Sequence, residues 1–264
     1  MFIVLVILSI SIKRVERWTQ KAIDVVFLSK QETATFLEED KDKYVTSLSL
    51  VDLYARKSND AKHYISKIKR CASSFTDLEK TKLIRCSQIA DKFLKSYIYQ
   101  DAINGKDIAK IQWKFAITRK NESNQYEEGL PHTRSDIIFL SEYVINDNIA
   151  LGNDDTILTN TLIHEKVHIY QRQNELVLGR LIAKMGYNVA SNIEHKLRRS
   201  NPDIDNKTYY DRNGNVLVFE YSSAKPENIN DVKYKGDFSS EHPYERIAYE
   251  IANEYTKSTM KKII

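Results

Sequence analysis

The sequence predicts an α+β fold with a helical N-terminal half, a small β-sheet and two late helices. Residues 1–100 contain neither glycine nor proline, and they repeat apolar side chains at helical spacing. Residues 109–145 are richer in β-branched and aromatic side chains, which favour strands. Residues 154–175 and 241–258 return to a helical pattern. A sheet between helical stretches is typical of the α+β class.

The first half is expected to consist of helices. In residues 15–30 the apolar side chains Val15, Trp18, Val25 and Val26 recur near helical spacing. The same periodicity returns in two later stretches, residues 45–57 and 80–99. Polar clusters, rather than glycine or proline, separate the predicted helices.

The middle of the chain is expected to supply the sheet. Residues 109–119 (AKIQWKFAITR) and 135–145 (SDIIFLSEYVI) are strand candidates. The polar loop at residues 120–129 separates them. Residues 206–223 hold an Asn213-Gly214 pair between two β-rich runs, which predicts a hairpin.

Three helices are expected in the second half. The first begins near Asp154 or Asp155, because an acidic residue suits a helix N-terminus. The second spans residues 175–186. The last spans residues 241–258 and places Pro243 at its first position, where the missing N–H costs nothing.

Composition excludes several classes of protein. The chain of 264 residues is 42% hydrophobic and 29% charged, with a formal charge of +4, which is typical of a globular domain. A nucleic-acid-binding face would need a denser basic patch, so no nucleic-acid partner is expected. Two cysteines are too few for a disulfide scaffold. The sequence also lacks the glycine-rich motifs that bind nucleotides.

The N-terminus leaves alternatives open. Residues 1–14 form a short apolar run that ends at Lys13-Arg14. A spanning helix needs about 20 apolar residues, and a signal peptide has a basic start and a small-residue cleavage site. A minimal membrane anchor, a buried core segment and a start that omits upstream residues all stay open.

The segment NTLIHEKVHIYQRQNE (160–175) carries the chemistry. His164 and His168 lie four residues apart, so a helix directs both imidazoles to one side. Zinc in catalytic sites takes three protein ligands and leaves one position open. Glu165 is turned about 100° from His164, beside such a metal rather than on it, in the position of a general base. The alternative is an amphipathic helix with two surface histidines.

A third ligand is expected from the last helix. It offers four glutamates, of which Glu245 lies at the edge of the face formed by Ala248, Tyr249 and Ala252. The others are less suitable, because two fall on the polar side at about 140° and 180° and one precedes Pro243: Glu250, Glu254 and Glu241. The sequence therefore predicts a zinc site of His164, His168 and Glu245.

The H-E-x-x-H pattern with a downstream helical glutamate resembles the gluzincin group of zinc metallopeptidases. The blocks EEGLPHTRSDIIFLS, HEKVHIYQR, NPDIDNKTYYDRNG and EHPYE are similar to an uncharacterised metallopeptidase family of large DNA viruses and some microbes. The resemblance covers about residues 32–256. It implies a zincin-like fold with the same three ligands and Glu165 as base. Gluzincins often carry a supporting aspartate four residues after the third ligand, where this chain has Tyr249.

The stretch LPHTRSDIIFLS resembles the edge strand that aligns a peptide substrate in such folds. This resemblance suggests that His132 stabilises the oxyanion, and a turn histidine is the alternative. Tyr170 and Tyr244 are further candidate oxyanion donors. Four other side chains are expected at the pocket rim or on the surface: Gln171, Arg172, His63 and His195.

The sequence therefore predicts a metallopeptidase that binds Zn²⁺ and acts on a peptide or protein. Residues 1–30 would form an apolar segment and helix. Residues 31–264 would form the zincin-like domain, helical over 31–105 and catalytic over 106–264. The alternatives are a non-catalytic zinc-fold binding or virion-structural protein, and a metal-dependent amidase or esterase. An intracellular or virion-associated location is expected, with a membrane anchor open through the N-terminal segment.

Overall fold

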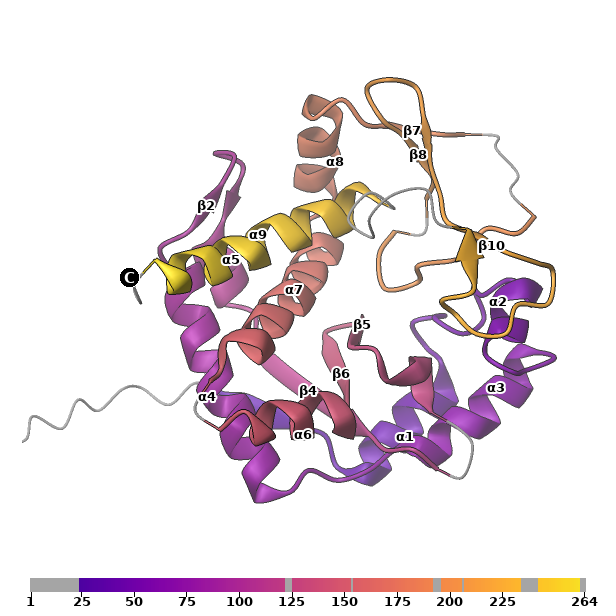
Figure 1. The fold of residues 1–264 in the computed structure, drawn as a ribbon, viewed down its shortest axis with the longest axis horizontal. Helices are drawn as coiled ribbons and strands as arrows, with labels where there is room; N and C mark the ends of the chain where they lie inside the picture. Colours follow the sequence, from indigo (N-terminus) through magenta and orange to yellow (C-terminus); the bar gives the residue numbers. More distant parts are fainter. Residues whose placement is uncertain are drawn as a thin grey trace, which may run out of the picture.

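The computed structural model describes residues 24–121, 125–152, 154–191, 196–205, 207–233 and 242–261. Over these residues the fold mixes helices and small sheets, as the sequence predicts (Figure 1). The apolar run at 1–14 and most of the helix expected at 15–30 lie outside the described residues.

The main sheet has four strands in the order β1-β4-β6-β5. β4 (Trp113–Thr118) pairs in parallel with β6 (Ile137–Ser141), which confirms both strand candidates. β6 is shorter than expected because Ser141 caps the helix that begins at Glu142. β5 (His132–Arg134) pairs antiparallel to β6 at the edge of the sheet, so the expected edge strand is present.

The helix expected over residues 15–30 is wrong at its end. Val25–Phe27 form β1, which pairs in parallel with Trp113–Phe115 of β4. The Phe27 ring stacks on the Phe115 ring with centroids 5.8 Å apart. Pairing with a distant strand overrides the local helical spacing, because a short run of β-branched residues can form either a helix or a strand. The sheet thus extends into the N-terminal segment, and the division of the chain at residue 30 stays a prediction.

Helices and capped turns alternate in the remaining first half, so the expectation that it is helical is met only in part. The helix expected over residues 80–99 ends at Leu94, and Ile98–Tyr99 form a short strand instead. Ser29, Ser49 and Thr76 each accept from the backbone N–H three residues on, and an acidic side chain returns the bond. The elements are α1 (Lys30–Glu39), α2 (Leu50–Ala55), α3 (Ala61–Ile68), η1 (Lys69–Cys71), α4 (Asp77–Leu94), β2 (Ile98–Tyr99), β3 (Ile103–Asn104) and α5 (Gly105–Ala109).

The long helix α7 (Thr156–Gln173) lies at the centre of the molecule and packs against α4, α9 and the sheet (Figure 1). Its predicted apolar side is buried: Leu162, Ile163 and Val167 are fully inaccessible to solvent. Helix α9 (Pro243–Met260) covers α7 with Ile247 and other apolar side chains. Burial of this shared face holds the two helices side by side.

A buried ion pair fixes the side of α7 that faces α4. The Lys166 Nζ lies 2.9 Å from the Asp91 Oδ1 and 3.8 Å from the centre of the Trp113 ring. Burial lowers the pKa of Lys166 to about 8, and Asp91 opposes this shift. Because Lys166 points into the core, the neighbouring Glu165 is turned to another side of the helix.

The remaining elements include the expected hairpin. β8 (Tyr209–Tyr210) and β9 (Val216–Leu217) pair antiparallel around the Asn213-Gly214 turn. Gly214 has a φ of +80°, which glycine adopts without strain. The other elements are η2 (Tyr126–Gly129), α6 (Glu142–Ala150), α8 (Glu175–Lys184), β7 (Asn188–Val189), β10 (Glu220–Tyr221) and β11 (Val232–Lys233). Among the described residues, no helix has the length and apolar character to cross a bilayer.

Candidate metal centre

Helices α7 and α9 bring the three predicted ligands together. The Nε2 atoms of His164 and His168 are 2.9 Å apart. The Glu245 Oε2 lies 3.3 Å from the His164 Nε2, and its Oε1 lies 3.5 Å from the His168 Nε2. His168 and Glu245 are buried, and His164 is partly exposed. The predicted grouping of these three side chains is confirmed, and zinc occupancy stays a prediction.

The spacing of the donor atoms fits a small tetrahedral cation. Zinc binds imidazole and carboxylate ligands at about 2.0–2.2 Å, so neighbouring donors lie roughly 3.3 Å apart. The His164–Glu245 separation matches that value and the His164–His168 separation is shorter, while the 3.5 Å distance from His168 joins it to the other carboxylate oxygen of Glu245. The donor set is two imidazoles and one carboxylate, which suits zinc. These residues therefore can hold such an ion.

Glu245 is selected from the four glutamates by its place in the first turn of α9. Glu250 bonds to Tyr99 and, at 2.8 Å, to Arg246, while Glu254 faces Lys257. Glu241 lies outside the described residues. Burial opposes ionisation of Glu245, but the His168 and His164 imidazoles hold its pKa well below the usual value. Of the three described glutamates, Glu245 is thus the one beside the two histidines, and its role as a metal ligand stays a prediction.

Glu165 lines the same pocket without belonging to the ligand cluster. Its side chain is buried, and its Oε2 has no hydrogen-bond partner among the described residues. Burial raises the pKa of Glu165 to about 8, and the Asp203 and Glu245 carboxylates add to the rise while His164 opposes it. A divalent cation beside the carboxylate would favour the ionised form. The carboxylate is therefore available to a molecule in the pocket.

Gln171 supports the cluster from behind. Its Oε1 lies 2.8 Å from the His168 Nδ1, and its Nε2 donates to the Tyr244 carbonyl oxygen at 2.9 Å. With Nδ1 donating, the His168 Nε2 is left free to bind a metal. Gln171 is fully buried, so its expected place at the rim is wrong. Helical spacing indicates this burial, because Gln171 follows the buried Val167 by four residues and so lies on the same side of the helix.

Two further side chains hold Glu245 and the start of its helix. Asn201 donates to the Glu245 Oε1 at 2.9 Å. His242 caps α9 by accepting from the Tyr244 backbone N–H at 3.1 Å, and its Nε2 lies 2.9 Å from the Asp205 Oδ1. The segment at 196–205 thus fixes the third ligand. Nothing in the local sequence indicated this role, because the contacts join distant parts of the chain.

The cluster opens into a pocket of about 400 Å³. His132 lines it, with the Nδ1 3.0 Å from the Leu130 carbonyl oxygen. Tyr249 also lines it and packs against His164 with ring centroids 4.4 Å apart. Tyr170 and Tyr244 do not line it, so they are poorly placed as oxyanion donors.

Three further side chains were expected at the rim or on the surface: Arg172, His63 and His195. Arg172 donates to the Ser135 carbonyl oxygen at 2.7 Å and to the Asp203 carbonyl oxygen, and it lies behind the pocket wall rather than at the rim. His63 is exposed, as expected. His195 lies outside the described residues.

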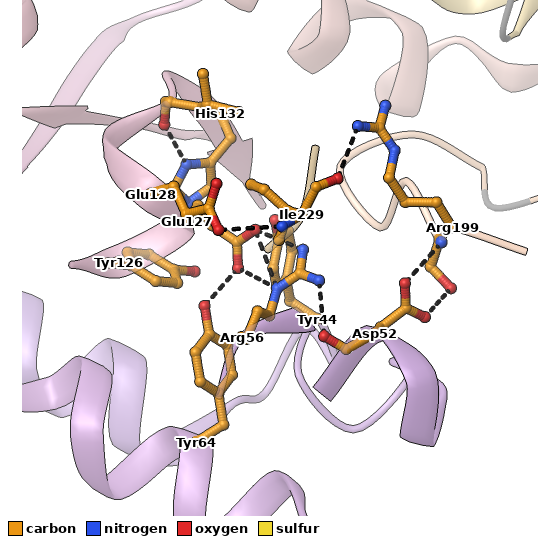
Figure 2. A network of polar contacts seen from close by, with 12 residues as sticks. Tyr44, Asp52, Arg56, Tyr64, Tyr126, Glu127, Glu128, His132, Arg199 and Ile229 are labelled. Carbon is orange, nitrogen blue, oxygen red and sulfur yellow. Dashed lines mark hydrogen bonds and ion pairs between the residues drawn. The ribbon is translucent and has the colours of Figure 1, made fainter. Parts of the chain in front are cut away.

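A buried polar network forms the wall of the pocket below His132 (Figure 2). Arg56 bonds to both carboxylate oxygens of Glu127, and the Tyr64 hydroxyl donates to the same group at 2.7 Å. Burial opposes ionisation, but Arg56 lowers the pKa of Glu127 to about 2. Glu127 and Glu128 have φ values of +44° and +54°, which residues other than glycine rarely adopt. No motif in residues 120–129 indicates this strained pair.

No family model, curated protein or solved structure compared with the chain matches it. The resemblance to gluzincins therefore stays a prediction from the sequence motifs.

Proposed function

We propose that this chain is a zinc-dependent hydrolase, and specifically a metallopeptidase. One observation carries the proposal. Three side chains that could each give a donor atom to one metal ion lie together, within 4.8 Å of one another, in the pocket where a carboxylate oxygen of Glu165 has no partner among the described residues. A metal ion with an adjacent base is one arrangement that hydrolyses an unreactive amide.

In this proposal His164, His168 and Glu245 would hold a zinc ion, which when bound would supply polarisation of the scissile carbonyl and a more acidic water molecule. Glu165 accepts a proton from the water molecule as the water oxygen bonds to the carbonyl carbon. The same carboxylate then passes the proton to the leaving nitrogen as the C–N bond breaks. His168 and Glu245 stay oriented through Gln171 and Asn201. The products are a carboxylic acid and an amine.

The surroundings of the cluster favour a peptide as substrate. β5 lies at the edge of the main sheet and next to α7, and an extended peptide can add a strand at such an edge. The pocket of about 400 Å³ is large enough for a small number of substrate side chains. An ester or a non-peptide amide would use the same chemistry, so these compounds belong in the test.

A purely structural zinc site closes its fourth position with a protein ligand. Among the described residues, the metal-binding cluster comprises three side chains only. Glu165 would also have no role at a structural site. Both points favour a hydrolase over a non-catalytic zinc-binding or virion-structural protein.

The test compares wild type, Glu165→Gln and chelator-treated protein on a mixed peptide library. Zinc analysis should give about one ion per chain, retained in Glu165→Gln. Cleavage should fall by about 10²–10⁴-fold in this variant. Glu175→Gln, an exposed substitution at the start of α8, is the matched control and should cleave at the wild-type rate. Zinc-loaded wild type that cleaves no peptide, ester or amide would reject the proposal.

A further inference from the structure

His132 is held in one tautomer. Its Nδ1 lies 3.0 Å from the Leu130 carbonyl oxygen, which can only accept, so Nδ1 carries the proton. The ring stacks on Phe139 with centroids 5.4 Å apart and meets the Tyr126 ring edge-on at 4.7 Å. Burial lowers the pKa of His132, although Glu127 opposes the shift. The neutral ring therefore presents the Nε2 lone pair.

This lone pair has no partner within the described part of the chain. The His132 side chain is only 6% exposed, and its Nε2 is among the buried atoms without a hydrogen bond. The residue nevertheless lines the pocket beside the metal centre. A neutral ring with this tautomer accepts a hydrogen bond but cannot donate one from Nε2. The arrangement thus argues against His132 as an oxyanion donor and in favour of a donor group on the bound molecule.

The charges around His132 indicate which kind of donor group on the bound molecule would lie beside it. The Glu127 and Asp203 carboxylates both line the pocket and both act on the His132 ring. Arg56 balances Glu127 through three hydrogen bonds, and Arg172 balances part of the charge of Asp203. Arg199 also lines the pocket, but its guanidinium donates to the Ile229 carbonyl oxygen at 3.3 Å and lies over the Phe219 ring. The His132 Nε2 and the Asp203 carboxylate are therefore the acceptors on this side of the pocket. A primary ammonium group has three donors and no acceptor, and charge-assisted bonds are stronger than bonds from a neutral amide.

We propose that His132 and Asp203 form a subsite for a primary ammonium group of the substrate. The group belongs either to the amino terminus of a peptide or to a lysine side chain, and both sources have the same chemistry. This inference rests on the proposed peptidase function, because it assigns a substrate feature to the same pocket. A neutral backbone amide bound to the His132 Nε2 is the rival occupant.

Binding measurements separate this inference from catalysis. Four alanine-based pentapeptides combine a free or acetylated amino terminus with one lysine or one norleucine. Calorimetry measures their affinity for the zinc-loaded Glu165→Gln protein. Loss of the recognised ammonium group should weaken binding about ten- to a hundredfold, and the pair that shows this difference identifies the source. Equal binding of all four peptides, or no binding of any, overturns the proposal.

Two variants test the named residues. His132→Phe keeps a flat ring against Phe139 and removes the acceptor, and Asp203→Asn keeps the shape and removes the charge. Each should abolish the preference for the ammonium-bearing peptide. Asp147→Asn, an exposed aspartate on α6, should keep it. Zinc content and the melting temperature verify folding, and Asp203→Asn decides the matter if His132→Phe does not fold. A preference retained in Asp203→Asn contradicts the assignment.

Cleavage by wild type distinguishes failure of the ammonium subsite from failure of the peptidase proposal. Equal cleavage of all four peptides, together with equal binding, rejects the ammonium subsite and leaves the peptidase proposal standing. No cleavage of any peptide, with the binding preference intact, rejects the peptidase and leaves the subsite.

Discussion

Removing the hydrogen bonds of Gln171 should weaken zinc binding without unfolding the protein. Gln171 joins the ligand His168 to the backbone of Tyr244, next to the ligand Glu245. Gln171→Met keeps the volume of this fully buried side chain and removes both bonds. The His168 ring then loses the acceptor that fixes its tautomer and direction.

The expected magnitude follows from the two bonds. A buried polar group left without its partner costs about 1–3 kcal/mol. Loss of a group that orients a metal-bound histidine costs about 10–100-fold in metal affinity, or roughly 1.4–2.7 kcal/mol. The two ranges agree. Gln171→Glu retains an acceptor for the His168 Nδ1 but loses the donor to Tyr244, so its zinc affinity should lie above that of Gln171→Met.

Competition with a chelator of known affinity measures the zinc dissociation constant of each variant. Gln173→Met, on the same helix but exposed, is the matched control and should bind zinc like wild type. Thermal unfolding in excess chelator reports the stability of the metal-free fold. A folded Gln171→Met protein with wild-type zinc affinity would refute the reasoning, and so would an equal loss in Gln173→Met.

Three more predictions follow from single contacts. Glu245→Ala should abolish stoichiometric zinc binding while Glu250→Ala retains it, and the reverse order in a zinc titration would reject the ligand assignment. Asp91→Ala should lower the free energy of unfolding by about 3–5 kcal/mol, because it leaves Lys166 charged and buried; denaturant unfolding measures this, and adding Lys166→Met should restore part of the loss. Burial opposes ionisation of Asp205, but its bond to His242 lowers its pKa from 3.8 to about 2. A carboxyl group whose pKa is lowered by folding stabilises the folded state above its ordinary pKa. This stabilisation, here about 2 kcal/mol, is lost as the pH falls from 4 to 2. Asp205→Asn should therefore make the melting temperature less dependent on pH in that window.

The sequence by itself determined that His164, His168 and Glu245 lie together. The four-residue spacing of His164 and His168 places both imidazoles on one face of any helix, and Glu165 necessarily turns to another side. Helical phase likewise separated Glu245 from Glu250. These inferences succeed because residues within one or two turns of a helix have fixed relative directions, whatever the helix packs against.

The tertiary structure alone decided which side chains complete the site. Asn201 reaches Glu245 across 44 residues of sequence, and the Arg56 bond to Glu127 spans 71. β1 exists because Val25–Phe27 find β4, which local periodicity cannot show. The tautomer of His132, which changes its chemical role from donor to acceptor, depends on the direction of the Leu130 carbonyl. Such features arise from long-range pairing and exact backbone direction, and neither is encoded in the pattern of neighbouring residues.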